Sequence, residues 1–335
     1  MDFLSQLEQY FSKNLLSKKY HTLFHRFYLG YKEALQKDHI DIKPYEPLLI
    51  QFLHLAKEQI EKPFRFEPYH KQVLSPVNHY RFGVEFVRPL IDMNRSSLQG
   101  EAYLQEISEK LKNQENVVFL ANHQVEADPQ AISILLEKNY PELAQNTIFV
   151  AGERVIIDPF AIPFSMGCNL LCIYSKRYID HPAELKTKKQ LHNKKTMELM
   201  SELLCEGGHS IYVAPSGGRD RINNKGEINV SPFDPSSIEL FYLMAQKASK
   251  PTSFYPMALY TYDLLPPPDD IQIEIGEERK TKRCGIHLSI GPCLSMENIL
   301  GPPELDKKKR REFRAEFIWA EVCKLYKEFP HTKKS

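Results

Sequence analysis

The sequence predicts an α/β protein, in which a mixed, largely parallel sheet is flanked by helices and preceded by a small N-terminal helical bundle. From about residue 117, short apolar runs alternate with helical patterns, which is typical of parallel strands joined by helices. Before about residue 67, apolar residues instead recur every three or four positions, the spacing of an amphipathic helix. We therefore expect a helical bundle domain over residues 1–75 and an α/β domain over residues 76–335.

Three helical patterns make up the expected bundle, over about 3–15, 23–35 and 48–60. Each carries a wide apolar stripe, which must be covered by the other helices or by the main domain. Nothing in these patterns indicates chemistry. Their aromatic side chains are therefore expected to form core.

Five short apolar runs predict the strands of the α/β domain, and the segments between them predict helices. The Gly207-Gly208 pair marks the end of one long helix. The expected strands are 117–121, 148–151, 170–174, 210–214 and 254–260; the clearest helices are 130–138, 182–206 and an amphipathic one after residue 303.

Composition excludes several classes of protein. The 335-residue chain has 44 Lys and Arg against 43 Asp and Glu, so its net charge of +1 gives no sign of a nucleic-acid binder. No apolar run is long enough to cross a bilayer, although a transient contact with a membrane surface is compatible with the sequence. The six cysteines lack Cys-x-x-Cys spacing and neighbouring histidines, so we expect reduced thiols and no metal site.

Polar residues follow three of the expected strands, each at its carboxyl end. Asn122-His123 follows the first strand, Ser175-Lys176-Arg177 another, and residues 215–221 (Pro-Ser-Gly-Gly-Arg-Asp-Arg) a third. Ligands of open α/β sheets bind at this edge, where the strands hold the loops rigidly. If these strands are parallel neighbours, the three loops form one site.

His123 is the candidate general base, because imidazole takes a proton from an alcohol near neutral pH, and does so better beside a carboxylate. Asp128 is the candidate carboxylate, since a residue before proline favours extended geometry and a loop that folds back. In an alternative interpretation, Asp128 only caps the helix that follows Pro129. Glu126 is the rival partner for the histidine.

The loop after the strand at 210–214 has the composition of an anion site. Gly217 and Gly218 let a ligand approach the backbone, and Arg219 and Arg221 can clamp phosphate oxygens. Ser216 lies in the same loop, but the spacing is not that of a nucleotide-binding P-loop. A glycine turn with a solvated Arg-Asp-Arg is the alternative.

Lysines crowd the beginning of the expected helix 182–206. Such a run is commonly a solvated face, and the alternative is a dock for an acidic partner. The lysines are Lys186, Lys188, Lys189, Lys194 and Lys195.

Three segments carry a family resemblance: 122–129 (Asn-His-Gln-Val-Glu-Ala-Asp-Pro), 149–156 (Phe-Val-Ala-Gly-Glu-Arg-Val-Ile) and 214–221 (Ala-Pro-Ser-Gly-Gly-Arg-Asp-Arg). In this order they resemble the soluble glycerol-3-phosphate acyltransferases of plastids and chlamydiae. The likeness runs from about Phe66 to the prolines at 266–268, and so covers most of the chain. The helical N-terminal part resembles the family mainly in character.

The resemblance implies transfer of a fatty acyl group from acyl carrier protein or coenzyme A to the 1-hydroxyl of glycerol 3-phosphate, the first step of phospholipid biosynthesis. It implies His123 as the base and Asp128 as its orienting partner. We expect no cofactor beyond the thioester cosubstrate. From the lack of a membrane-spanning run we expect a cytoplasmic location, or the plastid stroma if the chain is a mature plant-type one.

The family's phosphate clamp carries over to Arg219 and Arg221, and to the basic pair Lys176 and Arg177. Here the sequence departs from the plant pattern of lysine followed by histidine, because Tyr178 follows Arg177. Ser216 receives a weaker role, since membrane-bound relatives have glutamate there.

Direct transfer without an acyl-enzyme is expected, because no Gly-x-Ser-x-Gly elbow is present and the cysteines have no histidine partner in sequence. The acyl chain is expected in an apolar tunnel lined by Phe160, Phe164, Met166 and Leu170, which could equally be core. Two other functions stay open at this point: a thioesterase, and a non-enzymatic module that binds acyl carrier protein.

Overall fold

The structure is a computed structural model that describes residues 2–175, 179–266 and 280–330. Its centre is an eight-stranded sheet in the order β1-β5-β4-β6-β3-β9-β10-β2. The strands are β1 (Tyr69–His70), β2 (Ser97–Gln99), β3 (Asn116–Ala121), β4 (Ile148–Ala151), β5 (Asn169–Cys172), β6 (Ser210–Val213), β9 (Thr252–Tyr260) and β10 (His287–Ile290); β7 (Arg221–Ile222) and β8 (Ile228–Asn229) form a separate hairpin.

Five neighbouring strands of the sheet, β5, β4, β6, β3 and β9, run parallel to one another. Antiparallel pairing of β1 with β5 and of β10 with β9 makes the sheet mixed, while β2 pairs parallel with β10. The five parallel strands are those expected from the sequence, with ends that differ by at most two residues. A mixed, largely parallel sheet flanked by helices is therefore confirmed.

Helices cover both faces of the sheet. The first face is covered by α1 (Phe3–Ser12), α2 (Lys18–Gln36), α3 (Glu46–Glu61), α4 (His79–Val87), α5 (Glu101–Lys112), α6 (Asp128–Leu136), α7 (Pro141–Asn146), α8 (Arg154–Ile157) and α9 (Ile162–Ser165). The second face is covered by α10 (Lys186–Glu206), α11 (Pro235–Lys247) and α12 (Lys307–Lys327). Short 3₁₀ helices lie at Lys43–Tyr45, Arg88–Leu90, Met93–Arg95, Ala183–Leu185 and Tyr262–Leu264.

Strand β3 shows how the sequence divides between the two faces. Val117 and Phe119 pack into the core of the first face, whereas Val118 and Leu120 pack into the core of the second. Successive side chains of a strand point to opposite faces, so a strand covered on both sides is apolar throughout. All six residues of β3 are buried.

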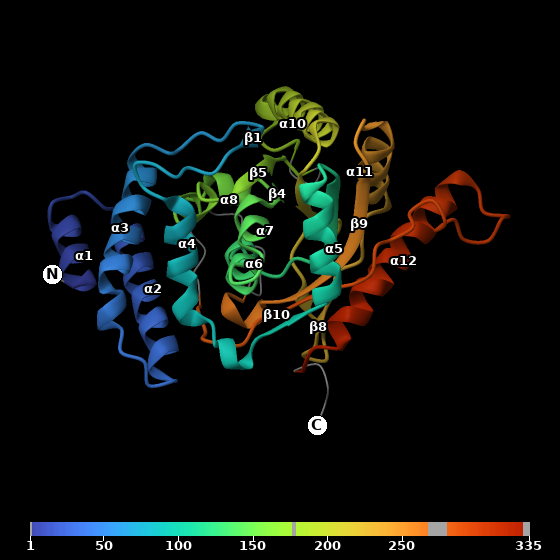
Figure 1. Cartoon of the computed structure of the whole chain (residues 1–335). Helices are drawn as coiled ribbons and strands as arrows, with labels where there is room; N and C mark the ends of the chain where they lie inside the picture. The colour runs from blue at the N-terminus through green and yellow to red at the C-terminus, as the bar shows by residue number, and fades with distance from the viewer. Residues whose placement is uncertain (1, 176–178, 267–279, 331–335) are drawn as a thin grey trace.

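The three N-terminal helices lie together beside α4, on the opposite side of the molecule from α12 (Figure 1). Their aromatic side chains continue into the core of the α/β part: the rings of Phe27 and Phe86 are stacked with centroids 6.0 Å apart, and those of Phe52 and Phe164 lie 5.5 Å apart. Strand β1 precedes residue 75 and yet joins the main sheet. We propose a division into two domains at residue 75, and one hydrophobic core extends over both of them.

The helices expected at 130–138, 182–206 and after residue 303 are present as α6, α10 and α12. Of the helices within the described ranges, none is both long and apolar enough to cross a membrane.

Candidate functional site

Two of the three expected polar loops meet at the carboxyl edge of the sheet. Strands β3 and β6 are parallel neighbours, so the loops after them leave on the same side. The backbone amide of Asp220 donates to the carbonyl of His123 at 2.7 Å, which joins the two loops directly. The third loop follows β5 in the same parallel block, but Lys176, Arg177 and Tyr178 lie outside the described residues.

His123 and Asp128 form a close pair. The imidazole Nδ1 lies 2.7 Å from Asp128 Oδ2. The carboxylate, which is 1% exposed, also accepts from the amides of Gln124 at 2.9 Å and Val125 at 3.3 Å, and from the hydroxyl of Thr261. A carboxylate held by several donors has a fixed orientation, so it fixes the orientation of the imidazole as well.

The backbone around Asp128 differs from what the sequence predicts. Asp128 is the first residue of α6, so the extended geometry expected before Pro129 is wrong. The helix-capping alternative is wrong too, because Ala127 occupies the N-cap position and no side chain caps the helix. The loop nevertheless folds back as expected: the amide of Asp128 donates to the carbonyl of Val125 at 3.1 Å.

The pKa of His123 is raised above its ordinary value by its surroundings. Burial acts against the charged imidazolium, but the hydrogen bond to Asp128 and the negative charge of that residue outweigh it. Part of the ring, 30% of the side chain, stays exposed. Since Nδ1 faces Asp128, Nε2 is the atom with which His123 can accept a proton from a ligand.

Glu126, the rival carboxylate, has a different partner. It pairs with Arg219, with Nη1 and Oε1 2.9 Å apart, and the two side chains are only 12% and 11% exposed. The guanidinium is thereby held close to the His123 loop. The alternative in which residues 219–221 are solvated is therefore wrong for Arg219. It is wrong for Asp220 as well, because Asp220 is fully buried.

The loop that precedes Arg219 is a glycine turn open to its surroundings. Gly217 has φ of 65°, in the left-handed region that favours glycine, and its amide donates to Ala214 at 3.1 Å. A Cβ atom at Gly217 or Gly218 would meet nothing within 4 Å. Ser216 donates its hydroxyl to the carbonyl of Gly218 at 2.9 Å, and Arg221 begins β7. The backbone of the turn is therefore open at both glycines.

A buried polar network fixes the two loops relative to each other. Asp220 Oδ2 accepts from Asn122 at 2.8 Å and from Gln124 at 3.2 Å, and its Oδ1 accepts from the amide of Ser231 at 2.8 Å. Burial raises the pKa of Asp220, and these hydrogen bonds offset only part of that effect. Asp220 thus connects the two neighbours of His123 to the segment that carries both arginines.

We expect Asp220→Asn to lower the free energy of unfolding by on the order of 1–3 kcal/mol, because one acceptor oxygen becomes a donor that faces at least one other donor in either orientation of the amide. The midpoint of urea denaturation measures this loss. Asp41→Asn, an exchange at an exposed aspartate, is the matched control and should stay within about 0.5 kcal/mol of the parent protein. Equal midpoints for both variants would contradict the role of the network.

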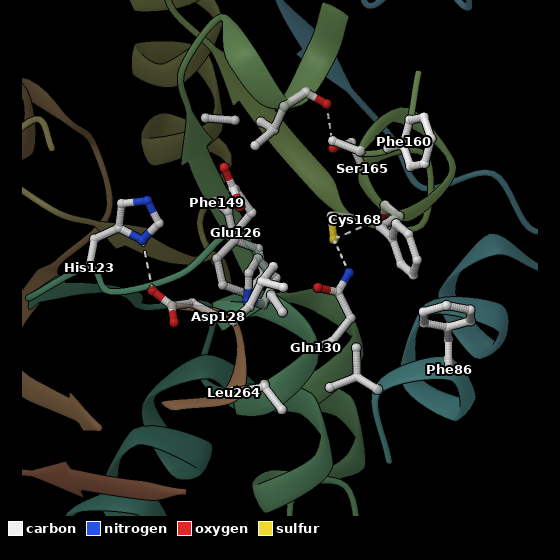
Figure 2. Close-up of a pocket in the computed structure, with 18 of the residues that line it drawn as sticks. Phe86, His123, Glu126, Asp128, Gln130, Phe149, Phe160, Ser165, Cys168 and Leu264 are labelled. Carbon is white, nitrogen blue, oxygen red and sulfur yellow. Dashed lines mark hydrogen bonds and ion pairs between the residues drawn. The ribbon is translucent and has the colours of Figure 1, made fainter. Parts of the chain in front are cut away.

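An apolar cavity of about 180 Å³ opens beside the His123–Asp128 pair. Figure 2 shows the pair toward one side of the cavity and Phe86 toward the other, with Gln130 and Cys168 between them. Of the four residues expected to line a tunnel, Phe160, Phe164 and Leu170 do so, while Met166 is buried but is not part of the lining.

The N-terminal helices contribute to this cavity, which the sequence did not indicate. Phe27 of α2 and Phe52 of α3 line it together with residues of the α/β part, among them Phe86 of α4. Their spacing is that of any helix core, so only the packing of the bundle against α9 distinguishes them.

The six cysteines are free thiols, and burial raises the pKa of Cys168, which lines the cavity, to about 12. A thiol with such a pKa is a poor nucleophile near neutral pH. Within the parts of the chain that are described, no group of three His, Cys, Asp or Glu side chains could hold a metal ion.

Comparison with known proteins defines the class first. The family model described as Acyltransferase matches residues 104–260, a span that runs from α5 to the end of β9 and includes His123, Asp128 and the arginine loop. A solved 1-acyl-sn-glycerophosphate acyltransferase from Thermotoga maritima is similar over 99% of this chain and 96% of its own, at 14% identity and a TM-score of 0.41.

The particular family follows from the relatives in sequence. A chloroplastic glycerol-3-phosphate acyltransferase of Carthamus tinctorius is 33% identical over 97% of this chain and 71% of its own length. Another, of Cucurbita moschata, is 42% identical over 81% of this chain, which spans 62% of that relative. The chain belongs to the glycerol-3-phosphate acyltransferase family, and it spans about half to two thirds of the length of several of these relatives.

Proposed function

We propose that the chain transfers a fatty acyl group from a thioester, acyl carrier protein or coenzyme A, to the sn-1 hydroxyl of glycerol 3-phosphate. The observation that carries this proposal is the placement of the His123–Asp128 pair beside both an apolar cavity and Arg219. Such a transfer needs a general base, a cavity for the acyl chain and a cation that binds the phosphate. The names of the relatives support the same acceptor.

His123 is the general base of the proposed reaction. Its Nε2 takes the proton of the acceptor hydroxyl as the oxygen attacks the thioester carbonyl, while Asp128 stabilises the imidazolium that forms. Collapse of the tetrahedral intermediate expels the thiolate, which can recover the proton from His123. The transfer exchanges an alcohol for a thiol without redox change, so it needs no cofactor beyond the thioester, and no acyl-enzyme.

Arg219 and Arg221 bind the phosphate of the acceptor in this proposal, with Ser216, Gly217 and Gly218 forming the turn beside them. The carboxylate of Glu126 keeps Arg219 in place until a phosphate shares or replaces that contact. Lys176, Arg177 and Tyr178, outside the described residues, are proposed to complete the acceptor site.

The acyl chain occupies the cavity lined by Phe160, Phe164 and Leu170. Burial of methylene groups there supplies donor affinity, at about 0.8 kcal/mol for each group. The cavity starts at the catalytic pair, so the thioester carbonyl lies within reach of an acceptor bound at Arg219.

The carrier of the acyl group is proposed to dock on the lysine-rich side of α10, since acyl carrier protein is acidic. Lys186, Lys194 and Lys195 are exposed there, with 49%, 75% and 52% of their side chains accessible. Lys189 does not belong to that surface, because its side chain is 5% exposed and its ammonium pairs with Glu153 at 3.0 Å.

The test is release of the thiol carrier, followed with and without glycerol 3-phosphate, for acyl carrier protein and coenzyme A donors in parallel. We expect release only when the acceptor is present, and the donor with the higher kcat/KM identifies the carrier. Undiminished release without the acceptor would identify a thioesterase. Binding of acyl carrier protein without any release would identify a non-enzymatic module.

We expect Arg219→Ala to raise the KM for glycerol 3-phosphate by about 10- to 100-fold with a smaller change in kcat, since a charged hydrogen bond to the phosphate is lost. Steady-state kinetics at saturating donor measure the change. Glu126→Gln is the matched control: it removes the ion pair but keeps the arginine, so the acceptor KM should stay equal or fall. An equal rise in both variants would show that Arg219 only supports the loop.

A further inference from the structure

The wall of the cavity is mostly apolar, and one of its polar parts is a partition formed by Gln130 and Cys168. Gln130 of α6 is 5% exposed, and its amide donates to the thiol of Cys168, with Nε2 and Sγ 3.6 Å apart. The thiol in turn donates to the carbonyl of Phe164 at 3.6 Å. Figure 2 shows the amide and the sulfur facing each other across the middle of the view.

A second, smaller cavity of about 10 Å³ lies behind this partition. It shares four wall residues with the large cavity, namely Pro129, Gln130, Phe149 and Cys168. A space of that volume holds about one water-sized group. These shared residues border both the acyl cavity and the additional space.

The far wall of the second cavity can accept an apolar group, although it contains hydroxyls. The hydroxyl of Ser133 lies 3.0 Å from the carbonyls of both Pro129 and Ala144, and that of Thr147 donates to the carbonyl of Leu143 at 2.7 Å. Since these hydroxyls are already bonded to backbone oxygens, a terminal methyl group there would not leave them unsatisfied.

Helix α4 packs against the side chain of Gln130. A Cβ atom at Gly83 would lie 3.3 Å from Nε2 and 3.4 Å from Cγ of Gln130, so the backbone of α4 packs closely against that side chain. The glutamine therefore cannot retreat toward α4 when an acyl chain enters. In a close-packed wall, adding or removing a single methylene group already disturbs the packing.

We propose that the Gln130–Cys168 partition sets the upper limit of acyl chain length by closing the large cavity off from the small one. The inference rests on the proposed acyl transfer and names the residues that determine its donor specificity. Gln130→Ala removes the four side-chain atoms beyond Cβ and joins the two cavities, which makes room for roughly two further methylene groups.

The experiment measures kcat/KM for a series of saturated acyl-coenzyme A donors that differ by two carbons, with glycerol 3-phosphate saturating. In Gln130→Ala, we expect the donor two carbons longer than the parent optimum to gain about tenfold relative to that optimum. Gln130→Leu, which fills much of the same space and removes the amide, is the control and should keep the parent preference. Cys168→Ala should shift the chain-length preference in the same direction but to a smaller extent. If Gln130→Ala does not fold, the chain-length profile of Cys168→Ala tests the inference instead.

An active parent protein with identical chain-length profiles in Gln130→Ala and Cys168→Ala would overturn the inference, as would an equal shift in Gln130→Leu. A shift in Phe86→Leu alone would place the end of the chain against the aromatic wall of α4 instead. Failure of the proposed function is distinguishable, because the parent protein would then form no acylated product with any donor.

Discussion

His123→Ala is expected to lower kcat for acyl transfer by on the order of 10³-fold or more, the scale of losing a positioned general base. In the proposed reaction the side chain contributes Nε2 as the proton acceptor, and the hydrogen bond and negative charge of Asp128 raise its pKa above the ordinary value. Single-turnover rates with saturating donor and acceptor separate this chemical step from binding.

A second histidine provides the matched control for that substitution. His209 is also partly exposed, at 27% of its side chain, and also lies near a carboxylate, with Glu206 at 3.4 Å. It lies before β6, at the opposite end of that strand from the arginine loop. His209→Ala should keep activity within about twofold, and both variants should show the parent circular dichroism. Near-normal turnover in His123→Ala would contradict the assigned base.

Asp128→Asn is expected to lower kcat by about 10²- to 10⁴-fold, because an amide neither holds the same imidazole tautomer nor stabilises the imidazolium. The acid limb of the kcat/KM profile should also move to lower pH. The hydrogen bond and the charge that raise the pKa of His123 are lost, whereas the burial that lowers it stays. The neutral, reactive form of His123 then persists to more acidic pH, at a lower plateau.

The phosphate of the acceptor also titrates near pH 6, but it does so identically with both proteins, so the difference between the two profiles reports His123. Glu126→Gln is the control for carboxylate loss near the site, since Glu126 pairs with Arg219 instead. Its acid limb should move much less than that of Asp128→Asn. An unchanged limb in Asp128→Asn would contradict the coupling between Asp128 and His123.

Local sequence was sufficient for the elements that carry the site. The apolar runs that became β3, β6 and β9 are strands buried on both faces, so they lack alternation but are bounded clearly by polar loops. The sequence predicts the His123–Asp128 pair because the two residues lie only five positions apart, in one loop after a strand. In its actual geometry Asp128 opens α6 and also accepts a hydrogen bond from the hydroxyl of Thr261, 133 residues away.

Long-range contacts explain what the sequence could not predict. Glu126 reaches Arg219, and Asp220 reaches Asn122, only because β3 lies directly beside β6 in the sheet order. Strand order is a tertiary property that residue patterns do not encode locally. Likewise, Phe52 has the pattern of a bundle core residue, and it lines the cavity because α3 packs against α9.

Product analysis tests the central proposal most directly. Purified protein is mixed with acyl carrier protein or coenzyme A thioester and glycerol 3-phosphate, and the lipid is identified by mass spectrometry with positional analysis. We predict 1-acylglycerol 3-phosphate as the product, formed in amounts equal to the thiol released and absent with His123→Ala. Free fatty acid as the main product, or no product with either donor, would contradict the assignment of acyl transfer to this site.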